Sequence, residues 1–524
     1  MVEKGSLEKG DAEAIVEVPS GELVYGDDRS LQPPPPLTPQ EEKRLWRKID
    51  LRTLPILTAL YLMASIVRGG IGNAKLQGLT TQLGLTGEKY NVALAMYFVS
   101  YTVFTIPSNL VIKKLRPSKW LPGIMLVYGI IATLMGLVKS YSQLVAVRTL
   151  LGMAEAGLPP GVFYYITMWY PRHMVQYRIG LFWGGATFAG AFSGLLAFGI
   201  SFMSGTGGLL GWSWIFVSLS AAVDSVCEII QLALHIMQII EGLIGVVIAS
   251  TAFLVLYDFP DTASFLTPEE RSYVVNRLKY DNSSVGEEEH FEWRQLWQTV
   301  FDWRVLVCCL INMSVIAPVF GITLFLPSII NGFGFDTVTS QLLSIPPYVL
   351  ATITVIAWSK WSDALKMRSP FIFAGLVLGL IGFAINDANV SIGAKYFGTF
   401  LAVTGSYAGF PGNISWLGNN TVGQYRRAVA IAMQVTFANV GGTIACNIYR
   451  DRDAPRYLLG HGIELGFVSM GLVLLPVMVT MYMRANARRD ASQRDMQEQG
   501  LKIEYTPEDI RKLGDQAPDF RYTL

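Results

Sequence analysis

Long apolar segments recur along most of this chain and restrict what it can fold into. From Leu51 onward, mainly apolar runs repeat, each roughly 17 to 25 residues long, the length an α-helix needs to cross a ~30 Å hydrocarbon core. Open chain segments are unstable in lipid because their backbone groups find no hydrogen-bond partner. With 51% hydrophobic and 15% charged residues, the sequence predicts an all-α integral membrane protein.

The apolar segments fall into two sets of six, separated by a polar stretch at 258–304. The predicted spans of the first half are 51–72, 90–112, 120–138, 144–165, 180–203 and 239–257. Those of the second half are 306–330, 342–358, 371–384, 394–416, 428–448 and 466–483. We therefore expect twelve transmembrane helices in two halves, with a disordered N-terminal tail at 1–50, a first half at 51–257, a linker at 258–304, a second half at 305–484 and a C-terminal tail at 485–524.

Lysine and arginine concentrate in alternate short loops. Even-numbered spans exit into basic loops, which hold Lys113, Lys114, Arg116, Lys119, Arg172, Arg178, Lys360, Lys366, Arg368, Arg426 and Arg427. Cytoplasmic loops carry the excess of basic residues in membrane proteins. We therefore expect these loops, the central linker and both termini to be cytoplasmic.

A weak internal repeat joins two of the basic loops. Lys113, Lys114 and Arg116 follow the second span, and Asp363 and Arg368 follow the eighth, its counterpart in a six-plus-six duplication. Parallel repeats that meet at a central site are a recurring plan among transporters. We predict that these five residues belong to loops that gate a rocking movement of the halves.

Three ionisable residues lie within predicted spans. Arg68 lies towards the end of the first, and Arg148 and Glu155 lie seven positions apart in the fourth, which puts both on one helical face. Because a charge at mid-membrane costs roughly 2.5 to 3.5 kcal/mol on insertion scales, such residues are functional candidates. Either the arginines bind an anionic group and Glu155 exchanges a proton, or the charges form a structural ion pair or extend to the interface.

Other polar residues also interrupt the spans. Tyr164 follows a stretch rich in glycine and proline at 157–161, where the fourth span is expected to bend, and it belongs either to an interfacial aromatic belt or to a substrate surface. Asn413 and Asn420 carry amides that bind either a substrate or a neighbouring helix. Asn389 begins an Asn-x-Ser sequon in a predicted outer loop and is a predicted glycosylation site.

Composition and motifs exclude several classes of function. A formal net charge of +1 and scattered basic clusters argue against nucleic acid as a partner. The four cysteines, Cys227, Cys308, Cys309 and Cys446, lie in apolar stretches without the spacing of metal ligands. The sequence contains no zinc-binding HExxH, Gly-x-Ser-x-Gly elbow or phosphate loop, so we predict neither an enzyme nor a bound cofactor or metal.

A series of short motifs resembles one group of transporters. The motifs are Ile71-Gly72-Asn73-Ala74-Lys75, Pro107-Ser108-Asn109-Leu110, Arg148 with Gly152 and Glu155, Pro160-Gly161, Tyr164-Tyr165, Trp169-Tyr170, Asn419-Asn420, Gly441-Gly442 and Asn447-Ile448-Tyr449. Together they resemble the fungal allantoate-permease-like branch of the major facilitator superfamily, a group of anion:cation symporters. The resemblance covers nearly all of residues 51–483.

The resemblance implies proton-coupled uptake of a small carboxylate or vitamin, such as allantoate, nicotinate, pantothenate or biotin, across the plasma membrane. The partners are then an organic anion, protons and the lipid bilayer. The expected substrate-binding residues are Arg68, Asn73, Arg148, Tyr164, Asn413 and Asn420, and the expected proton-coupling residue is Glu155. An efflux carrier for a secondary metabolite or drug is an alternative with the same fold.

Two departures from this group are visible. Its members usually carry Asp-Arg-x-Asn before Ile-Gly-Asn-Ala, whereas this chain has Val67-Arg68-Gly69-Gly70, so an acid and an amide are missing while Arg68 is kept. Related chains also run from Trp-Ile-Phe directly into Ile-Glu-Gly, whereas here residues 217–238 intervene.

The insertion at 217–238 has two interpretations. A valine codon begins with GT and a glutamine codon can end in AG, so a retained intron, with a transport-inactive product, is one hypothesis. An amphipathic element is the other, because Asp224, Glu228, Gln231 and His235 recur at helical spacing. We predict that the insertion forms no independent span, since a thirteenth crossing would place the basic loops of the second half outside.

Overall fold

All regular secondary structure in the described part of the chain is helical. The computed structural model describes residues 37–76, 78–136, 138–201, 248–282, 293–450, 453, 456–499, 514–518 and 520–524. The predicted all-α architecture is confirmed. The insertion at 217–238, the first part of the predicted sixth span (239–247) and most of the predicted N-terminal tail lie outside these residues.

The described part of the first half contains long helices and several short ones. They are α1 (Pro39–Leu76), α2 (Leu79–Gln82), α3 (Lys89–Leu115), α4 (Pro117–Met135), α5 (Tyr141–Glu155), α6 (Leu158–Trp169), η2 (Arg172–Met174) and α7 (Val175–Ser201). Residues 248–255 are also helical. The break between α5 and α6, where Gly157 precedes the prolines of the first turn of α6, is the predicted bend of the fourth span.

The linker and the second half follow. The linker holds η4 (Pro260–Thr262), α10 (Pro268–Asn282) and α11 (Trp293–Val300). The second half holds α12 (Trp303–Asn331), α13 (Thr337–Leu343), α14 (Ile345–Leu365), α15 (Ser369–Asp387), α16 (Ile392–Asn420), α17 (Gln424–Ile448) and α18 (Leu458–Glu498), and η6 (Gly514–Gln516) lies beyond it.

Eight helices among the described residues are long and apolar enough to cross a membrane. They coincide with predicted spans one to three, seven to nine, eleven and twelve. The other predicted spans fall in α5 with α6, in α7, in α16 and in the segment that ends with helical residues 248–255. The described helices are therefore consistent with twelve crossings.

Helix α1 begins at Pro39, inside the segment predicted to be a disordered tail. The Thr38 hydroxyl accepts a hydrogen bond from the Glu41 amide at 3.4 Å, and the Glu41 carboxylate accepts one from the Thr38 amide at 2.9 Å. This reciprocal pair is a capping box, and Pro39 suits the first helical position. Buried Leu45 and Trp46 then fix the first turns against the bundle, so the helix starts well before the apolar run.

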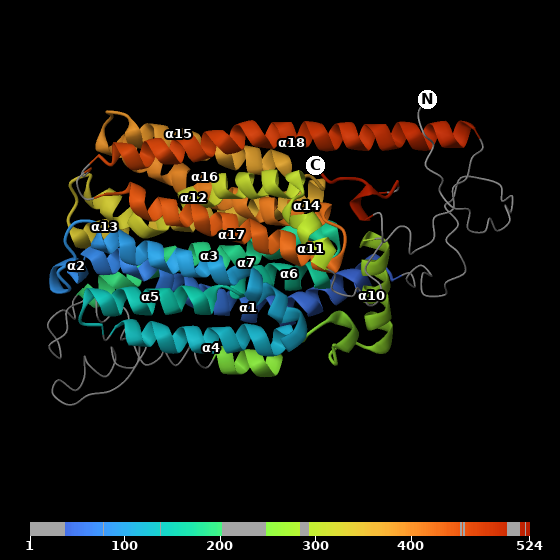
Figure 1. Cartoon of the computed structure of the whole chain (residues 1–524), viewed down its shortest axis with the longest axis horizontal. Helices are drawn as coiled ribbons and strands as arrows, with labels where there is room; N and C mark the ends of the chain where they lie inside the picture. Colours follow the sequence, from blue (N-terminus) through green and yellow to red (C-terminus); the bar gives the residue numbers. More distant parts are fainter. Residues whose placement is uncertain are drawn as a thin grey trace, which may run out of the picture.

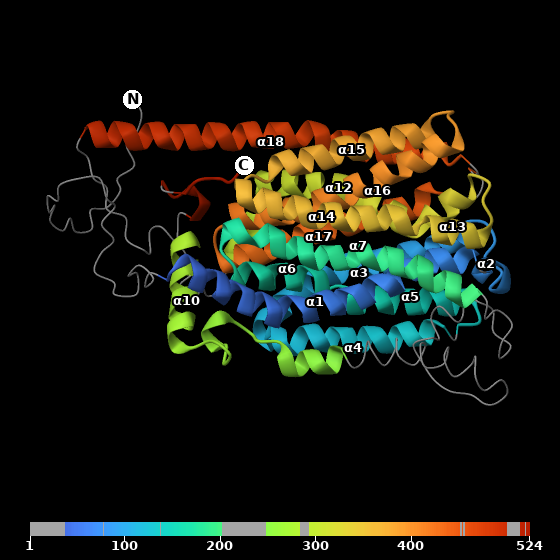
Figure 2. The ribbon, with the colours of Figure 1, turned by 180° about the vertical axis from the view of Figure 1, so that it is seen from behind.

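The helices lie side by side, with the first half along one side of the bundle and the second along the other (Figures 1 and 2). Between the halves, α3 packs on α17 and α7 packs on α14, while α1 also contacts α12. Helices α2 and α13 lie at one end of the bundle, and α10 and α11 lie at the other (Figure 1). We call the end with α10 the basic end, because the predicted cytoplasmic loops lie there.

Helix α10 stands across the basic end (Figures 1 and 2). Glu270 of α10 pairs with Lys48 of α1 at 2.6 Å. Burial alone would raise the pKa of Glu270, but the hydrogen bonds from Lys48 and Thr267 outweigh it and leave the pKa below its ordinary value. The linker helix is therefore tied to the start of the first half by a charged contact.

Candidate functional site

A cavity lies between the two halves. Its empty space, counted with the solvent at its mouth, amounts to about 560 Å³. Helices α1 and α7 supply one wall, and α12, the end of α13, α14 and α16 supply the other. The lining residues are Tyr61, Ser65, Arg68, Gly69, Asn73, Trp183, Ala186, Gly190, Ser193, Val319, Phe320, Thr323, Pro327, Ser344, Tyr348 and Tyr407.

Arg68 of α1 brings a positive charge to the cavity. It pairs with Glu155 at the end of α5, and Tyr97 of α3 donates its hydroxyl hydrogen to the same carboxylate. Arg68 is 6% exposed and Glu155 is 0% exposed. The Nε atom of Arg68 has no hydrogen-bond partner within the described residues. The charge of the cavity wall therefore depends on a carboxylate buried behind it.

Arg148 lies near this cluster but does not pair with Glu155. It is 0% exposed, and its guanidinium lies 4.9 Å from the centre of the Tyr97 ring. None of its three guanidinium nitrogens has a hydrogen-bond partner in the part of the chain that the structure describes. Arg148 and Glu155 thus contact the same tyrosine, while the ion pair joins Glu155 to another helix.

The sequence of this chain matches a family of membrane transporters and several of its members. Residues 57–224 match the model of the major facilitator superfamily. An uncharacterized transporter of Schizosaccharomyces pombe is 33% identical over 98% of this chain and 95% of its own length. The chain belongs to the major facilitator superfamily. It is a multi-pass membrane transporter and not an enzyme.

Two other relatives extend the comparison. A major facilitator transporter of Penicillium expansum is 32% identical over 98% of this chain and 97% of its own length. The high-affinity nicotinic acid transporter of Saccharomyces cerevisiae is 30% identical over 93% of this chain and 86% of its own length.

Solved major facilitator structures share the fold. The fucose:proton symporter of E. coli aligns with a TM-score of 0.55 at 12% identity, over 81% of this chain and 98% of its own. A bacterial homolog of the human lysosomal transporter Spinster, in an inward-facing and occupied conformation, aligns with a TM-score of 0.52 at 14% identity, over 85% of this chain and 97% of its own. These likenesses concern the fold alone.

The other expected substrate-binding residues of this major facilitator protein are dispersed. Asn73 lines the cavity and donates to the Ser193 hydroxyl at 3.1 Å. Tyr164 is buried in α6 and is not among the cavity-lining residues. Asn413 donates to the Asn312 side chain at 3.1 Å, away from the cavity lining. The structure thus brings together Arg68, Asn73 and Glu155, with Arg148 close by against Tyr97. It leaves Tyr164, Asn413 and Asn420 apart.

Asn413 belongs to a buried amide network that joins three helices of the second half. Asn312 of α12 donates to the backbone carbonyl of Gln434 at 2.9 Å, and Gln434 of α17 donates to the carbonyl of Asn413 at 3.2 Å. With the bond from Asn413 to Asn312, the network closes on itself. This geometry matches the helix-joining alternative for Asn413.

Asn420 lies at the basic end, far along α16 from the cavity lining. Its side-chain oxygen accepts from the Thr523 amide at 2.8 Å, and its side-chain nitrogen donates to the Thr523 carbonyl at 3.1 Å. Asn420 therefore binds the backbone of Thr523, which lies 103 positions later in the sequence.

The predicted gating loops also lie at the basic end. Asp363 pairs with Arg368 at 2.6 Å and accepts from the backbone amide of Tyr177, in the other half, at 2.7 Å. Arg368 donates to the carbonyl of Arg172 in the first half at 3.0 Å. Arg116 links α3 and α4 with a φ of 64°, and the side chains of Lys113 and Lys114 lie outside the described set. The second-half loop thus joins the two halves.

Asn389, the predicted glycosylation site, lies in the loop between α15 and α16 and is exposed. This loop is at the end of the bundle opposite α10. Its position is compatible with modification on the outer side, which stays a prediction.

Sequence reasoning missed the aromatic residues of the cavity and one buried acid. Tyr61, Trp183, Tyr348 and Tyr407 line the cavity, but tyrosine and tryptophan recur throughout the spans and carry no mark of their position. Glu464 of α18 is 0% exposed, and neither carboxylate oxygen has a hydrogen-bond partner within the described residues. The sequence held one signal for Glu464, because an acid lies two positions before the predicted start of the last span at residue 466.

Proposed function

We propose that this chain is a proton-coupled carrier of small organic anions. The observation that supports the proposal is the Arg68–Glu155 ion pair, because a guanidinium on the cavity wall is suited to bind an anion and the carboxylate behind it is suited to bind a proton. Rocking of the two halves would expose the cavity to each side of the membrane in turn. The basic end is proposed to face the cytoplasm.

Competition for Arg68 supplies the coupling. An ionised Glu155 neutralises the guanidinium, so an incoming carboxylate finds little net charge to bind. Protonation of Glu155 removes that competitor and leaves the guanidinium free to bind the substrate carboxylate by paired, charge-assisted hydrogen bonds. Proton and anion therefore bind favourably together, and neither binds well alone.

Tyr97 assists this exchange. Its hydroxyl donates to the Glu155 carboxylate, and a hydroxyl can turn to accept instead when the carboxyl is protonated. The buried guanidinium of Arg148 lies 4.9 Å from the centre of the same ring.

The cavity favours a flat monoanion. Aromatic rings of Tyr61, Trp183, Tyr348 and Tyr407 line it, and Arg68 is its one cationic lining residue among those described. Flat unsaturated bodies stack on such rings, whereas a second carboxylate would be buried without a partner. The similarity to a nicotinic acid transporter supports this choice, since nicotinate is a small flat monocarboxylate.

Uptake measurements in transporter-deficient cells test the proposal. We expect labelled nicotinate, or another flat monocarboxylate from a panel, to enter faster as external pH falls and to stop accumulating when a protonophore is added. Glu155→Gln should still exchange external for internal substrate but lose accumulation against a gradient. Glu269→Gln, which changes an exposed acid of α10, is the matched control and should behave as the parent.

Two results would refute the proposal. Uptake that ignores both pH and protonophore would exclude proton coupling. Accumulation by Glu155→Gln at the parental level would show that the proton is carried elsewhere.

A further inference from the structure

Residues 514–518 and 520–524, here called the docked segment, lie against the basic end of the bundle. The segment reaches it from beyond α18, the longest helix of the second half. Asp515, Phe520 and Tyr522 are each 4–5% exposed. The segment carries a charged carboxylate and polar backbone groups, and such groups are buried only where the bundle supplies hydrogen-bond and charge partners for them.

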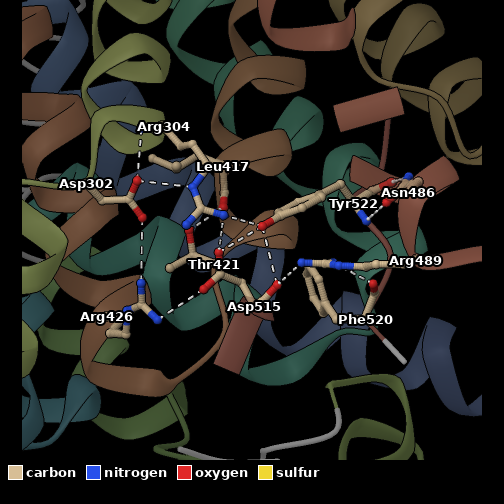
Figure 3. A network of polar contacts seen from close by, with 10 residues as sticks. All are labelled: Asp302, Arg304, Leu417, Thr421, Arg426, Asn486, Arg489, Asp515, Phe520 and Tyr522. Atoms are coloured by element: carbon tan, nitrogen blue, oxygen red, sulfur yellow. Dashed lines mark hydrogen bonds and ion pairs between the residues drawn. The ribbon is translucent and has the colours of Figure 1, made fainter. Parts of the chain in front are cut away.

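Asp515 completes a network of alternating charges (Figure 3). Its carboxylate pairs with Arg304 at the start of α12 at 2.6 Å and with Arg426 at the start of α17 at 3.3 Å. Asp302 pairs with the same two arginines at 3.2 Å and 3.7 Å. Two acids therefore share two arginines, and removal of Asp515 would leave the arginines undercompensated.

Tyr522 anchors the segment to α18 and to the charged network. Its ring stacks on Tyr482 with 4.4 Å between centroids, and its backbone exchanges two hydrogen bonds with the Asn486 side chain at 2.8 Å and 2.9 Å. Its hydroxyl accepts from Arg304 and donates to Asp515 at 3.0 Å. Burial and the nearby Asp515 raise the pKa of this hydroxyl, so it stays protonated and continues to donate.

The backbone of the segment is also bound. Arg489 of α18 donates to the carbonyls of Phe520 and Asp515, each at 2.7 Å (Figure 3). Trp416 donates to the carbonyl of Thr523 at 2.8 Å, next to the two hydrogen bonds that the Thr523 backbone exchanges with the Asn420 side chain. These partners all belong to the second half, so the segment is fixed to that half.

Within the described residues, the segment also contacts the first half. The guanidinium of Arg172, in the turn before α7, lies 4.8 Å from the centre of the Phe520 ring. The carbonyl of Arg172 accepts from Asn419 at 3.1 Å and from Arg368 at 3.0 Å, both in the second half. Arg368 also donates its backbone amide to the carbonyl of Leu524 at 2.5 Å. The docked segment thus lies directly on the junction that closes the basic end.

We propose that the docked segment is an intramolecular latch that holds the basic end closed. To open that end, the turn at Arg172 must move away from Asn419 and Arg368. Because the segment is fixed to the second half, this movement also pulls Arg172 away from Phe520. The latch therefore favours the closed state and makes each opening slower. The proposal needs only the rocking of the halves and is independent of substrate and proton coupling.

Loss of the Phe520 ring measures the latch with little damage elsewhere. Phe520→Leu keeps an apolar side chain and the backbone hydrogen bonds of the segment. It removes the contact of the ring with Arg172, together with ring contacts to Arg489 and Tyr522 that lie within the second half and the segment itself. Loss of a cation–π contact shifts an equilibrium by about two- to fivefold. Spin labels at Lys119→Cys and Lys360→Cys, exposed positions near the basic ends of α4 and α14, report the distance across that end. We expect the fraction of molecules with a long distance to rise about two- to fivefold.

A double-mutant cycle assigns the effect to the proposed contact. Combined with Arg172→Gln, Phe520→Leu should add little, because the contact is already lost. The matched control is Arg521→Gln, which breaks pairs with Asp490 and Gln493 on the second half alone and should leave the distances unchanged. All variants carry Cys227→Ser, and a thermal unfolding midpoint close to the parent's shows that they are folded.

Two outcomes would overturn the latch. Folded Phe520→Leu protein with the parental distance distribution would show that the segment does not influence opening. Independent, additive effects of Phe520→Leu and Arg172→Gln would show that the two side chains act through other partners. Neither result would bear on proton-coupled uptake, which is measured separately.

Discussion

Arg68 and Glu155 bury opposite charges from two helices almost completely. Removing both from water costs several kcal/mol for each ion, and their attraction in the dry interior repays this only when the geometry is good. Such a pair adds little net stability relative to apolar residues. Loss of one partner, however, leaves an uncompensated buried charge and is strongly destabilising. A switch operated by protonation of Glu155 needs such a large change in free energy.

Removal of Arg68 alone tests that difference. Arg68→Gln leaves Glu155 buried without its cation, and we expect the free energy of unfolding to fall by about 3–5 kcal/mol. Purified protein in detergent, followed by its unfolding midpoint, gives the measurement. The double variant Arg68→Gln with Glu155→Gln should regain most of the loss, because no charge is then buried. A double variant as unstable as the single one would contradict the paired interpretation.

The site was partly predictable at this scale. Arg68 and Glu155 stood out because charged residues are costly within spans, and that argument needs no three-dimensional information. Which residue Glu155 pairs with was not predictable, because Arg148 shares its helix whereas Arg68 comes from a distant one. The aromatic walls escaped prediction because Tyr407 and Trp183 differ in no local feature from rings that face lipid or pack elsewhere.

At the scale of helices, glycine determines how closely α15 and α16 approach. A Cβ on Gly405 of α16 would meet backbone atoms of Gly375 and Gly379 in α15. Small residues allow such backbone contact in membrane bundles, where packing replaces the hydrophobic effect between helices. Neither backbone can retreat from an added methyl group without separating the helices.

Gly405→Ala should therefore destabilise the bundle by about 1–3 kcal/mol, the usual cost of overpacking a tight contact. Gly466→Ala is the matched control, because a Cβ there would meet nothing within 4 Å. In the control, alanine should be neutral or stabilise α18 by about 0.5–1 kcal/mol. Unfolding midpoints of the two variants give the comparison, and equal midpoints would refute the close-packing argument.

The helix ends show where prediction from apolar runs stops. The spans predict the membrane-crossing parts of α1 and α18 well, but α1 starts at Pro39 and α18 continues to Glu498. Both extensions lie where the chain is polar, so hydropathy gives no signal for them. The capping box at Thr38 follows a sequence pattern that can be recognised without a structure. The binding of Asn486 and Arg489 to the docked segment could not be predicted, because it depends on the three-dimensional fold.

At the scale of the whole molecule, the two halves meet at both ends. The basic end is closed by Asp363, Arg368 and the docked segment. At the opposite end Glu88 pairs with Arg450 at 3.8 Å, and Gly72 packs against the backbone of Leu324. The cavity at Arg68 is thus enclosed between two sets of contacts. Alternating access requires that they break one at a time.

The insertion at 217–238 also bears on the whole molecule, because it enters the first half just before its last predicted span. An acid such as Asp224 costs roughly 2.5–3.5 kcal/mol at the centre of a membrane helix. We expect a chain lacking 217–238 to reach the cell surface in severalfold greater amount than the full chain and to take up correspondingly more labelled carboxylate. The matched control is the full-length chain with Asp224→Asn and Glu228→Gln. It should recover only that part of the lost surface amount and uptake that the two charges cause. Equal surface amount and equal uptake for the full and shortened chains would show that the insertion is tolerated, and would leave the retained-intron hypothesis without a functional consequence.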